Sequence, residues 1–204
     1  MSDDAISFYA EHADMLADRY DAVPVEAHFA PVRALLPDGP AHVLDIGAGT
    51  GRDARWLADL GHTVTATEPV AGFFEKARTT DSRVTWLQDG LPDLPALSKG
   101  AARFDLITLS GVWHHVAPAD LTRAAASISR LLAPSGLLLM SLRSGPSHPG
   151  LPVYPVDATD TAKLFTPHAL LEHARIPAPS LQQTNRDAGV TWTWLALRRT
   201  GAPT

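Results

Sequence analysis

The sequence contains no cysteine, which excludes disulfides, thiolate metal sites and cysteine nucleophiles. It also has no long basic run. The longest is Arg198-Arg199, and 17 Lys and Arg residues against 22 Asp and Glu residues leave a net charge of −5. Nucleic acids are bound through clustered positive charge, so this balance disfavours a nucleic-acid partner.

Long apolar runs are absent as well. A membrane span needs roughly 18 consecutive apolar residues, and no run in the sequence approaches that length. The N-terminus, Met1-Ser2-Asp3-Asp4, is acidic and has no apolar secretory segment. We therefore expect a cytoplasmic protein that does not contact membranes, either a monomer or a homodimer. A chain of 204 residues, 45% of them hydrophobic, suits a single domain over 1–204 with a full core.

Strand and helix signals alternate along most of the chain. We expect an N-terminal helical cap over 1–37, with helices at 3–20 and 25–36. A core over 41–143 follows, with strands at 42–46, 63–67, 83–87, 104–109 and 137–142 and helices at 52–60, 71–78 and 119–132.

The C-terminal part over 144–204 is expected to contain a loop, a helix and a hairpin. Thr166 and Pro167 suit the start of a helix that runs to about Ala174. Strands near 179–184 and 190–198 would flank a turn at 185–189. The whole pattern predicts an α/β fold: a Rossmann-like, seven-stranded, mostly parallel sheet with a terminal antiparallel hairpin and helices on both faces.

The stretch Val-Leu-Asp-Ile-Gly-Ala-Gly-Thr-Gly at 43–51 is the most informative motif. A buried strand that enters a glycine turn and then a helix brings backbone close to a ligand. A dinucleotide fingerprint would need glycine at 47, 49 and 52, but position 52 is Arg and the third glycine is Gly51. A nicotinamide oxidoreductase is therefore disfavoured. A turn with a purely structural role is the alternative.

The spacing Asp45-x-Gly47-x-Gly49-x-Gly51 resembles motif I of the class I S-adenosylmethionine-dependent methyltransferases. Over 42–143 the chain is most similar to the small bacterial enzymes of the ubiquinone-biosynthesis and tellurite-resistance type. The resemblance implies S-adenosyl-L-methionine as cofactor and S-adenosyl-L-homocysteine as product. It places the methionine end of the cofactor on this turn, including Ala48, with Arg52 near its carboxylate.

The resemblance also implies contacts to the rest of the cofactor. Glu68 ends the second strand and would hold both ribose hydroxyls, with Pro69 beside the ribose. Asp89 would take the adenine amine, and the adjacent Gly90 and Leu91 would meet the ring. Ser110 and Tyr20 complete the expected cofactor set. The alternatives are a solvated carboxylate at Glu68 and a plain Asp-Gly turn at Asp89.

Catalytic and acceptor residues are expected around the same strand ends. His114 and His115 follow the fourth strand, and an imidazole ordinarily titrates near neutrality, so one of them could act as a base. Packing or helix capping is the alternative for both. Tyr9 and His12 on the N-terminal helices, together with Arg143 and His148, are candidate acceptor contacts. The alternation of Trp192 and Trp194 indicates sheet core.

We expect the acceptor to be a small molecule methylated on O, N or S, and we expect no metal. Ser110-Gly111-Val112-Trp113 stands where base-methylating enzymes carry an Asn/Asp-Pro-Pro-Tyr-like loop. One alternative keeps the fold and cofactor but has a protein or tRNA acceptor. The other is a cofactor-binding regulatory or partner subunit that has lost catalysis.

Overall fold

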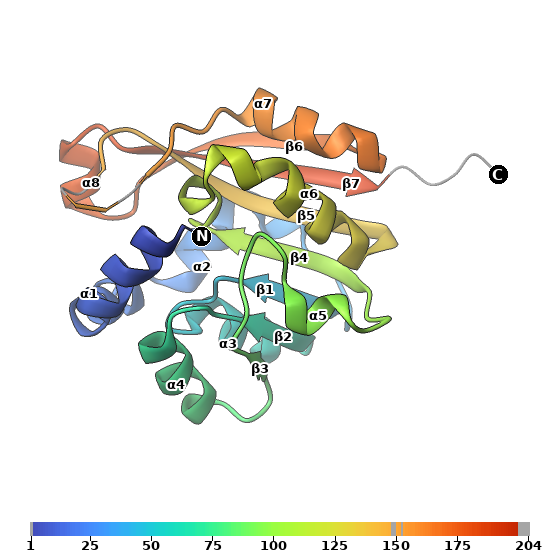
Figure 1. The fold of residues 1–204 in the computed structure, drawn as a ribbon, viewed down its shortest axis with the longest axis horizontal. Coiled ribbons are helices and arrows are strands. Elements are labelled where there is room, and N and C mark those ends of the chain that lie inside the picture. The colour runs from blue at the N-terminus through green and yellow to red at the C-terminus, as the bar shows by residue number, and fades with distance from the viewer. Residues whose placement is uncertain (1, 148–149, 152, 200–204) are drawn as a thin grey trace.

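The computed structural model describes residues 2–147, 150–151 and 153–199. Its centre is a seven-stranded sheet in the order β3-β2-β1-β4-β5-β7-β6 (Figure 1). Six strands run parallel and β7 is antiparallel to both of its neighbours, β5 and β6. The predicted fold class is confirmed. The strands are β1 (His42–Ile46), β2 (Thr63–Thr67), β3 (Thr85–Leu87), β4 (Phe104–Ser110), β5 (Leu132–Ser144), β6 (Leu170–Pro179) and β7 (Thr191–Arg199).

Helices cover both faces of the sheet because the central strands are apolar on both sides. The helices are α1 (Asp3–Asp21), α2 (Val25–Phe29), α3 (Arg52–Asp59), α4 (Ala71–Thr80), α5 (Pro95–Ser98), α6 (Leu121–Leu131), α7 (Ala158–Phe165) and α8 (Gln183–Asp187). On one face Leu44 and Ile107 pack with α5, α6 and α7. On the other, Val43 and Leu106 pack with α2 and α3, so neighbouring residues of one strand serve opposite layers.

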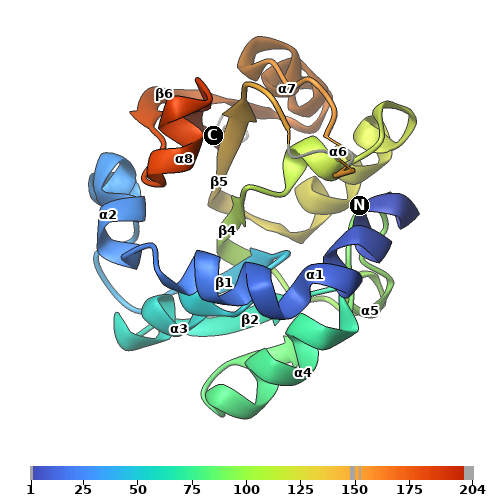
Figure 2. The same cartoon turned by 90° about the vertical axis from the view of Figure 1, so that its left-hand side faces the viewer.

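The first helix, α1, packs mainly on α4. Leu16 and Ala17 of α1 form a small apolar cluster with Val70 and with Phe73 of α4. Figure 2 shows α1 crossing the end of the sheet beneath β4. Within the described residues, no helix combines the length and the apolar character needed to cross a membrane.

The C-terminal part differs from expectation. The predicted helix at 166–174 is wrong: the helix is α7, where the Asp157 carboxylate caps the first turn by accepting from Thr159 N–H and Asp160 N–H. Thr166–His168 form only a short 3-10 turn, and Ala169 turns the chain into β6. The predicted strand near 179–184 is also wrong, because β6 ends at Pro179 and α8 follows.

Proline shapes two segments of the chain, the edge strand β6 and the second expected helix. In β6, Pro177 and Pro179 are tolerated because β6 is the edge strand of the sheet. The second expected helix, at 25–36, stops being α-helical after Phe29 and continues as a 3-10 segment over Ala30–Leu35, which has Pro31 in its first turn. The parallel core contains no comparable departure, and its strands begin or end within a few residues of the predicted bounds except for the longer β5.

Replacing Gly51 with Ala should destabilise the fold more than the same change at Gly61. Both residues have positive φ, +81° and +90°, which costs Ala about 1–2 kcal/mol. A Cβ at Gly51 would also lie 2.5 Å from Cη2 of Trp86, whereas one at Gly61 meets nothing within 4 Å. We expect Gly51→Ala to lose about 1–3 kcal/mol more of the free energy of unfolding, measured by urea denaturation. Equal losses would contradict the packing role of Gly51.

Candidate functional site

A cavity of about 900 Å³ opens at the carboxyl ends of β1, β2, β4 and β5. This is the edge where parallel α/β sheets bind ligands, and the volume is at the upper end of the roughly 300–1,000 Å³ of small-molecule sites. Figure 2 looks onto this end of the sheet, with α1, α2 and α8 around it. The predicted site residues in the cavity wall are Tyr9, Tyr20, Asp45, Gly47, Ala48, Gly49, Arg52, Glu68, Ser110, His114, His115 and Arg143.

Other predicted site residues do not line the cavity: His12, Gly51, Pro69, Asp89, Gly90 and Leu91. His148 lies outside the described residues. The His12 ring is turned to its own helix, where Nδ1 lies 2.8 Å from the Phe8 carbonyl oxygen and the two rings stack.

Asp89 is buried, and its carboxylate caps α5. One oxygen accepts from Ala96 N–H at 2.9 Å, and the other accepts from Gly90 N–H at 2.8 Å. The residue therefore organises the loop after β3.

The glycine turn after β1 depends on three positive φ values, +70° at Gly47, +57° at Gly49 and +81° at Gly51. A Cβ at Gly47 would lie 2.6 Å from Cγ2 of Val112, so the turn packs tightly on the loop after β4. A Cβ at Gly49 would meet nothing within 4 Å. Gly49 thus presents open backbone to the cavity, while Gly47 and Gly51 press against neighbouring side chains.

Glu68 holds this turn against the end of β2. One carboxylate oxygen accepts from Gly49 N–H and the other from Val70 N–H, both at 2.8 Å. Burial raises the pKa of Glu68 to about 7, although both backbone hydrogen bonds favour the ionised form. Each oxygen has two lone pairs and uses one in these bonds, so the carboxylate can still accept from a ligand in the cavity.

Asp45 lies beneath the same turn and is fully buried. Its Oδ1 accepts from the Thr108 hydroxyl at 2.7 Å, while Oδ2 has no hydrogen-bond partner among the described residues. Burial, with the charge of Asp53 adding to it, raises the pKa of Asp45 to about 7. A buried acceptor without a donor is costly, so this oxygen is a point where a ligand donor would be stabilising.

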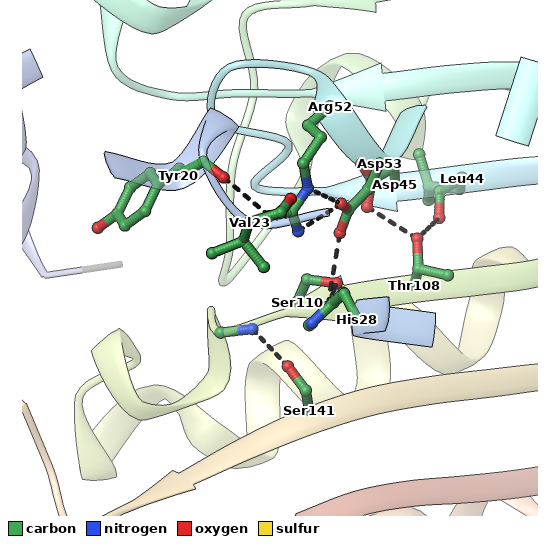
Figure 3. Close-up of polar contacts among 11 residues, drawn as sticks. Tyr20, Val23, His28, Leu44, Asp45, Arg52, Asp53, Thr108, Ser110 and Ser141 are labelled. Carbon is green, nitrogen blue, oxygen red and sulfur yellow. Dashed lines mark hydrogen bonds and ion pairs between the residues drawn. The ribbon is translucent and has the colours of Figure 1, made fainter. Parts of the chain in front are cut away.

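Asp53, which sequence reasoning missed, is the hub of a polar network (Figure 3). It accepts from Arg52 at 2.7 Å and from the Ser110 hydroxyl, and it lies 3.8 Å from His28 Nε2. Burial opposes its charge, but the facing His28 and Arg52 and these hydrogen bonds hold the pKa of Asp53 below its ordinary value. In the sequence, the only sign of this role is that Asp53 lies two residues after the glycine motif.

His28 is the second missed residue, and it reaches the cavity wall from α2. Its Nε2 lies 3.2 Å from the Ser110 hydroxyl oxygen, and its ring packs 4.9 Å from that of Trp194. Burial lowers the pKa of His28, with the Arg52 charge acting in the same direction and Asp53 opposing it. Nothing in the local sequence around 25–29 marks this contact, because it depends on where α2 lies over β4.

Arg52 does not point a free guanidinium at the cavity. It pairs with Asp53 at 2.6 Å and donates to the main-chain carbonyls of Tyr20 at 2.9 Å and Val23 at 3.3 Å. The expected contact to a cofactor carboxylate would compete with these bonds. In the structure Arg52 ties the end of α1 to the glycine turn.

The two histidines after β4 face different partners. His115 Nε2 lies 2.9 Å from the Tyr9 hydroxyl, which in turn accepts from the Tyr20 hydroxyl at 3.4 Å. His114 Nδ1 is buried with no hydrogen-bond partner among the described residues. Burial and the charges of His115 and Arg143 hold the pKa of His114 well below 6.5, so its imidazole is neutral at pH 7.

Comparison with known proteins agrees with this geometry. Residues 43–136 match the family described as a methyltransferase domain. The ubiquinone biosynthesis O-methyltransferase of Xanthomonas campestris pv. campestris is 33% identical over 123 residues, 58% of this chain and 48% of that protein. The chain spans about half the length of the curated relatives it matches.

Two crystal structures share the fold over nearly the whole chain. The TehB-like methyltransferase of Corynebacterium glutamicum has a TM-score of 0.70 at 20% identity, covering 93% of this chain and 99% of that one. The 1,6-didemethyltoxoflavin-N1-methyltransferase of Burkholderia thailandensis has a TM-score of 0.65 at 24% identity, covering 98% and 92%. With the match of residues 43–136 to a methyltransferase domain, these likenesses show that the chain shares the fold of these methyltransferases.

Proposed function

We propose that this chain transfers a methyl group from S-adenosyl-L-methionine to an O, N or S atom of a small molecule. The observation that carries the proposal is the division of one continuous cavity between two walls. One wall holds the glycine turn, Asp45 and Glu68. The other holds His114, Arg143 and Trp192 from the loop after β4 and from β5 and β7. A transferase needs both substrates in one dry space, and this cavity offers a separate surface to each.

The first wall fits the cofactor by its own chemistry. Asp45 Oδ2 is a buried acceptor without a donor, and Gly49 leaves open the space that a Cβ would fill. The ammonium group of the cofactor would donate to Asp45, and Glu68 would accept from the ribose hydroxyls with its remaining lone pairs. When bound, the cofactor supplies an electrophilic sulfonium methyl group, and the protein's task is to orient the acceptor.

The second wall can take a proton from the acceptor. His114 lies in the cavity wall, and its neutral imidazole has one ring nitrogen with a free lone pair. An acceptor hydroxyl or amine placed between His114 and the methyl group would give its proton to the imidazole as the new bond to carbon forms. His115 is already engaged by Tyr9, so it is the weaker candidate.

A screen for S-adenosylhomocysteine release across small-molecule metabolites tests the proposal directly. Release that depends on one compound, with the methylated product found by mass spectrometry, is the expected result. Tight cofactor binding with no release from any small molecule, but release from a protein or tRNA, would contradict the acceptor class.

Replacing Glu68 with Gln should weaken S-adenosylhomocysteine binding by about 10- to 100-fold, because a charge-assisted hydrogen bond of roughly 1.5–3 kcal/mol is lost. Calorimetry measures the affinity. Glu75→Gln on the exposed face of α4 is the matched control and should leave it unchanged. Glu68 also holds Gly49 and Val70, so the free energy of unfolding of both variants is measured in parallel. Unchanged affinity in a folded Glu68→Gln protein would refute the ribose contact.

The pH dependence of binding gives an independent test of the same contact. The pKa of Glu68 in the free protein is raised to about 7, so its ionised form is lost as the pH falls through 7. Since the ribose hydroxyls require the ionised form, affinity should decline between pH 8 and pH 6 in the wild type. The change of S-adenosylhomocysteine affinity with pH should be smaller in Glu68→Gln and unchanged in Glu75→Gln.

Replacing His114 with Ala should lower turnover at neutral pH by about 10²- to 10⁴-fold, the usual contribution of a general base. Cofactor affinity should not change. Because the pKa of His114 is held below 6.5, the acidic limb of the wild-type kcat/KM profile should lie below pH 6.5. His173→Ala on the exposed surface of β6 is the control. Full turnover of His114→Ala across the pH range would exclude His114 as the base.

A further inference from the structure

The charges around the cavity are separated. Its three carboxylates, Asp45, Asp53 and Glu68, all lie on the side of β1 and β2. Among the described residues, the only other ionised side chains in the wall are three arginines. Arg52 is neutralised by Asp53 at 2.6 Å, whereas no carboxylate in the described part of the chain pairs with Arg19 or Arg143.

Arg143 occupies the acceptor side, at the end of β5. In the sheet order β5 is separated from β1 and its glycine turn by β4. The guanidinium donates to the main-chain carbonyls of Gly145 and Pro146, and no carboxylate of the described residues pairs with it. Arg143 is only partly exposed, so the cation is half desolvated and its two contacts are to neutral groups.

This arrangement disfavours the charge that Arg143 carries. Burial, together with the positive charge of Arg19, lowers the pKa of Arg143, and the hydroxyls of Tyr9 and Tyr20 lie close enough to interact with it. A partly buried cation without an anion is destabilising unless a ligand supplies the negative charge. The contrast with Arg52, whose anion is built into the chain, points to Arg143 as a binding group.

Trp192 gives the same wall a flat surface. It lies directly opposite Arg143 in the antiparallel pairing of β5 and β7, so the two side chains emerge on the same face of the sheet. Its ring centroid is 6.2 Å from that of His114. A Cβ on Gly111 would be 3.4 Å from Cη2 of the indole, so the missing side chain keeps this surface open. Trp194, by contrast, is 2% exposed and belongs to the core.

We propose that the methyl acceptor is a planar aromatic or heteroaromatic molecule with an anionic substituent. The anion binds Arg143, and the ring lies against Trp192 with the methylated atom toward His114. This proposal rests on the methyltransferase function proposed above and specifies its acceptor. A guanidinium recognises carboxylates and phosphates alike by paired N–H donors, so both anions belong to the class. Indole and guanidinium together favour flat, negatively charged rings over neutral or aliphatic ones.

The test measures binding to the full chain saturated with S-adenosylhomocysteine. The probes are benzoate with benzamide, 4-hydroxybenzoate with 4-hydroxybenzamide, and phenyl phosphate with phenol. We expect each anion to bind about tenfold or more tightly than its neutral partner, as a lost charged hydrogen bond predicts. Arg143→Gln should remove that difference, and Arg143→Lys should keep part of it. The comparison of benzoate with phenyl phosphate separates carboxylate from phosphate recognition.

A control and a second variant keep the outcomes distinct. Arg175→Gln, which breaks an exposed ion pair with Glu172 and a hydrogen bond to the Thr159 hydroxyl, should retain the full preference. Trp192→Leu should weaken benzoate binding but not that of cyclohexanecarboxylate. Equal binding of anions and neutral partners, or no binding of either, overturns the proposal. So does an Arg143→Gln protein that loses affinity for S-adenosylhomocysteine, because Arg143 would then hold the cofactor. Failure of the wild type to bind S-adenosylhomocysteine would instead refute the proposed function.

Discussion

The two hydrogen bonds that the Glu68 carboxylate accepts from Gly49 and Val70 join the glycine turn after β1 to the loop after β2, where the cavity opens. The glycine turn has positive φ at each of its three glycines, and these three residues have no side chains that could hold it. A carboxylate that bridges the turn to the start of α4 supplies this restraint. The same carboxylate remains partly open to a ligand, so the group that holds the turn is also one that a nucleoside would meet.

The rest of the site follows from how each wall handles charge. On the β1 side the carboxylates are buried but supplied with donors by backbone, Thr108, Ser110 and Arg52. The β5 side includes a neutral imidazole and a cation, and the described part of the wall has no carboxylate there. A cationic cofactor and an anionic acceptor would each meet the wall of opposite charge. This polarity would order the two substrates in one cavity.

Sequence reasoning succeeded where chemistry is local and failed where it depends on packing. The apolar strands and the glycine spacing identify the parallel core and the cavity edge, because both follow from short-range rules. Asp53 and His28 were missed because their contact requires α2 to lie over β4, which no local pattern states. The helix predicted from Thr166 is wrong because Asp157 caps a helix that starts earlier, at Ala158. Residues 170–179 then pair with β7 as strand β6.

The position of α1 links the two walls. Near its C-terminal end, Arg52 donates to the carbonyl of Tyr20, the residue whose hydroxyl donates to Tyr9. Tyr9 then meets His115, and at the start of the helix Ser2 N–H donates to the His115 carbonyl. The helix packs on α4 through one small apolar cluster, and these polar contacts, with the ion pair of Asp14 and Lys76, help to hold it over the cavity. The contacts of Arg52, Tyr20, Tyr9 and His115 therefore form one continuous path from the glycine turn through α1 to the loop after β4.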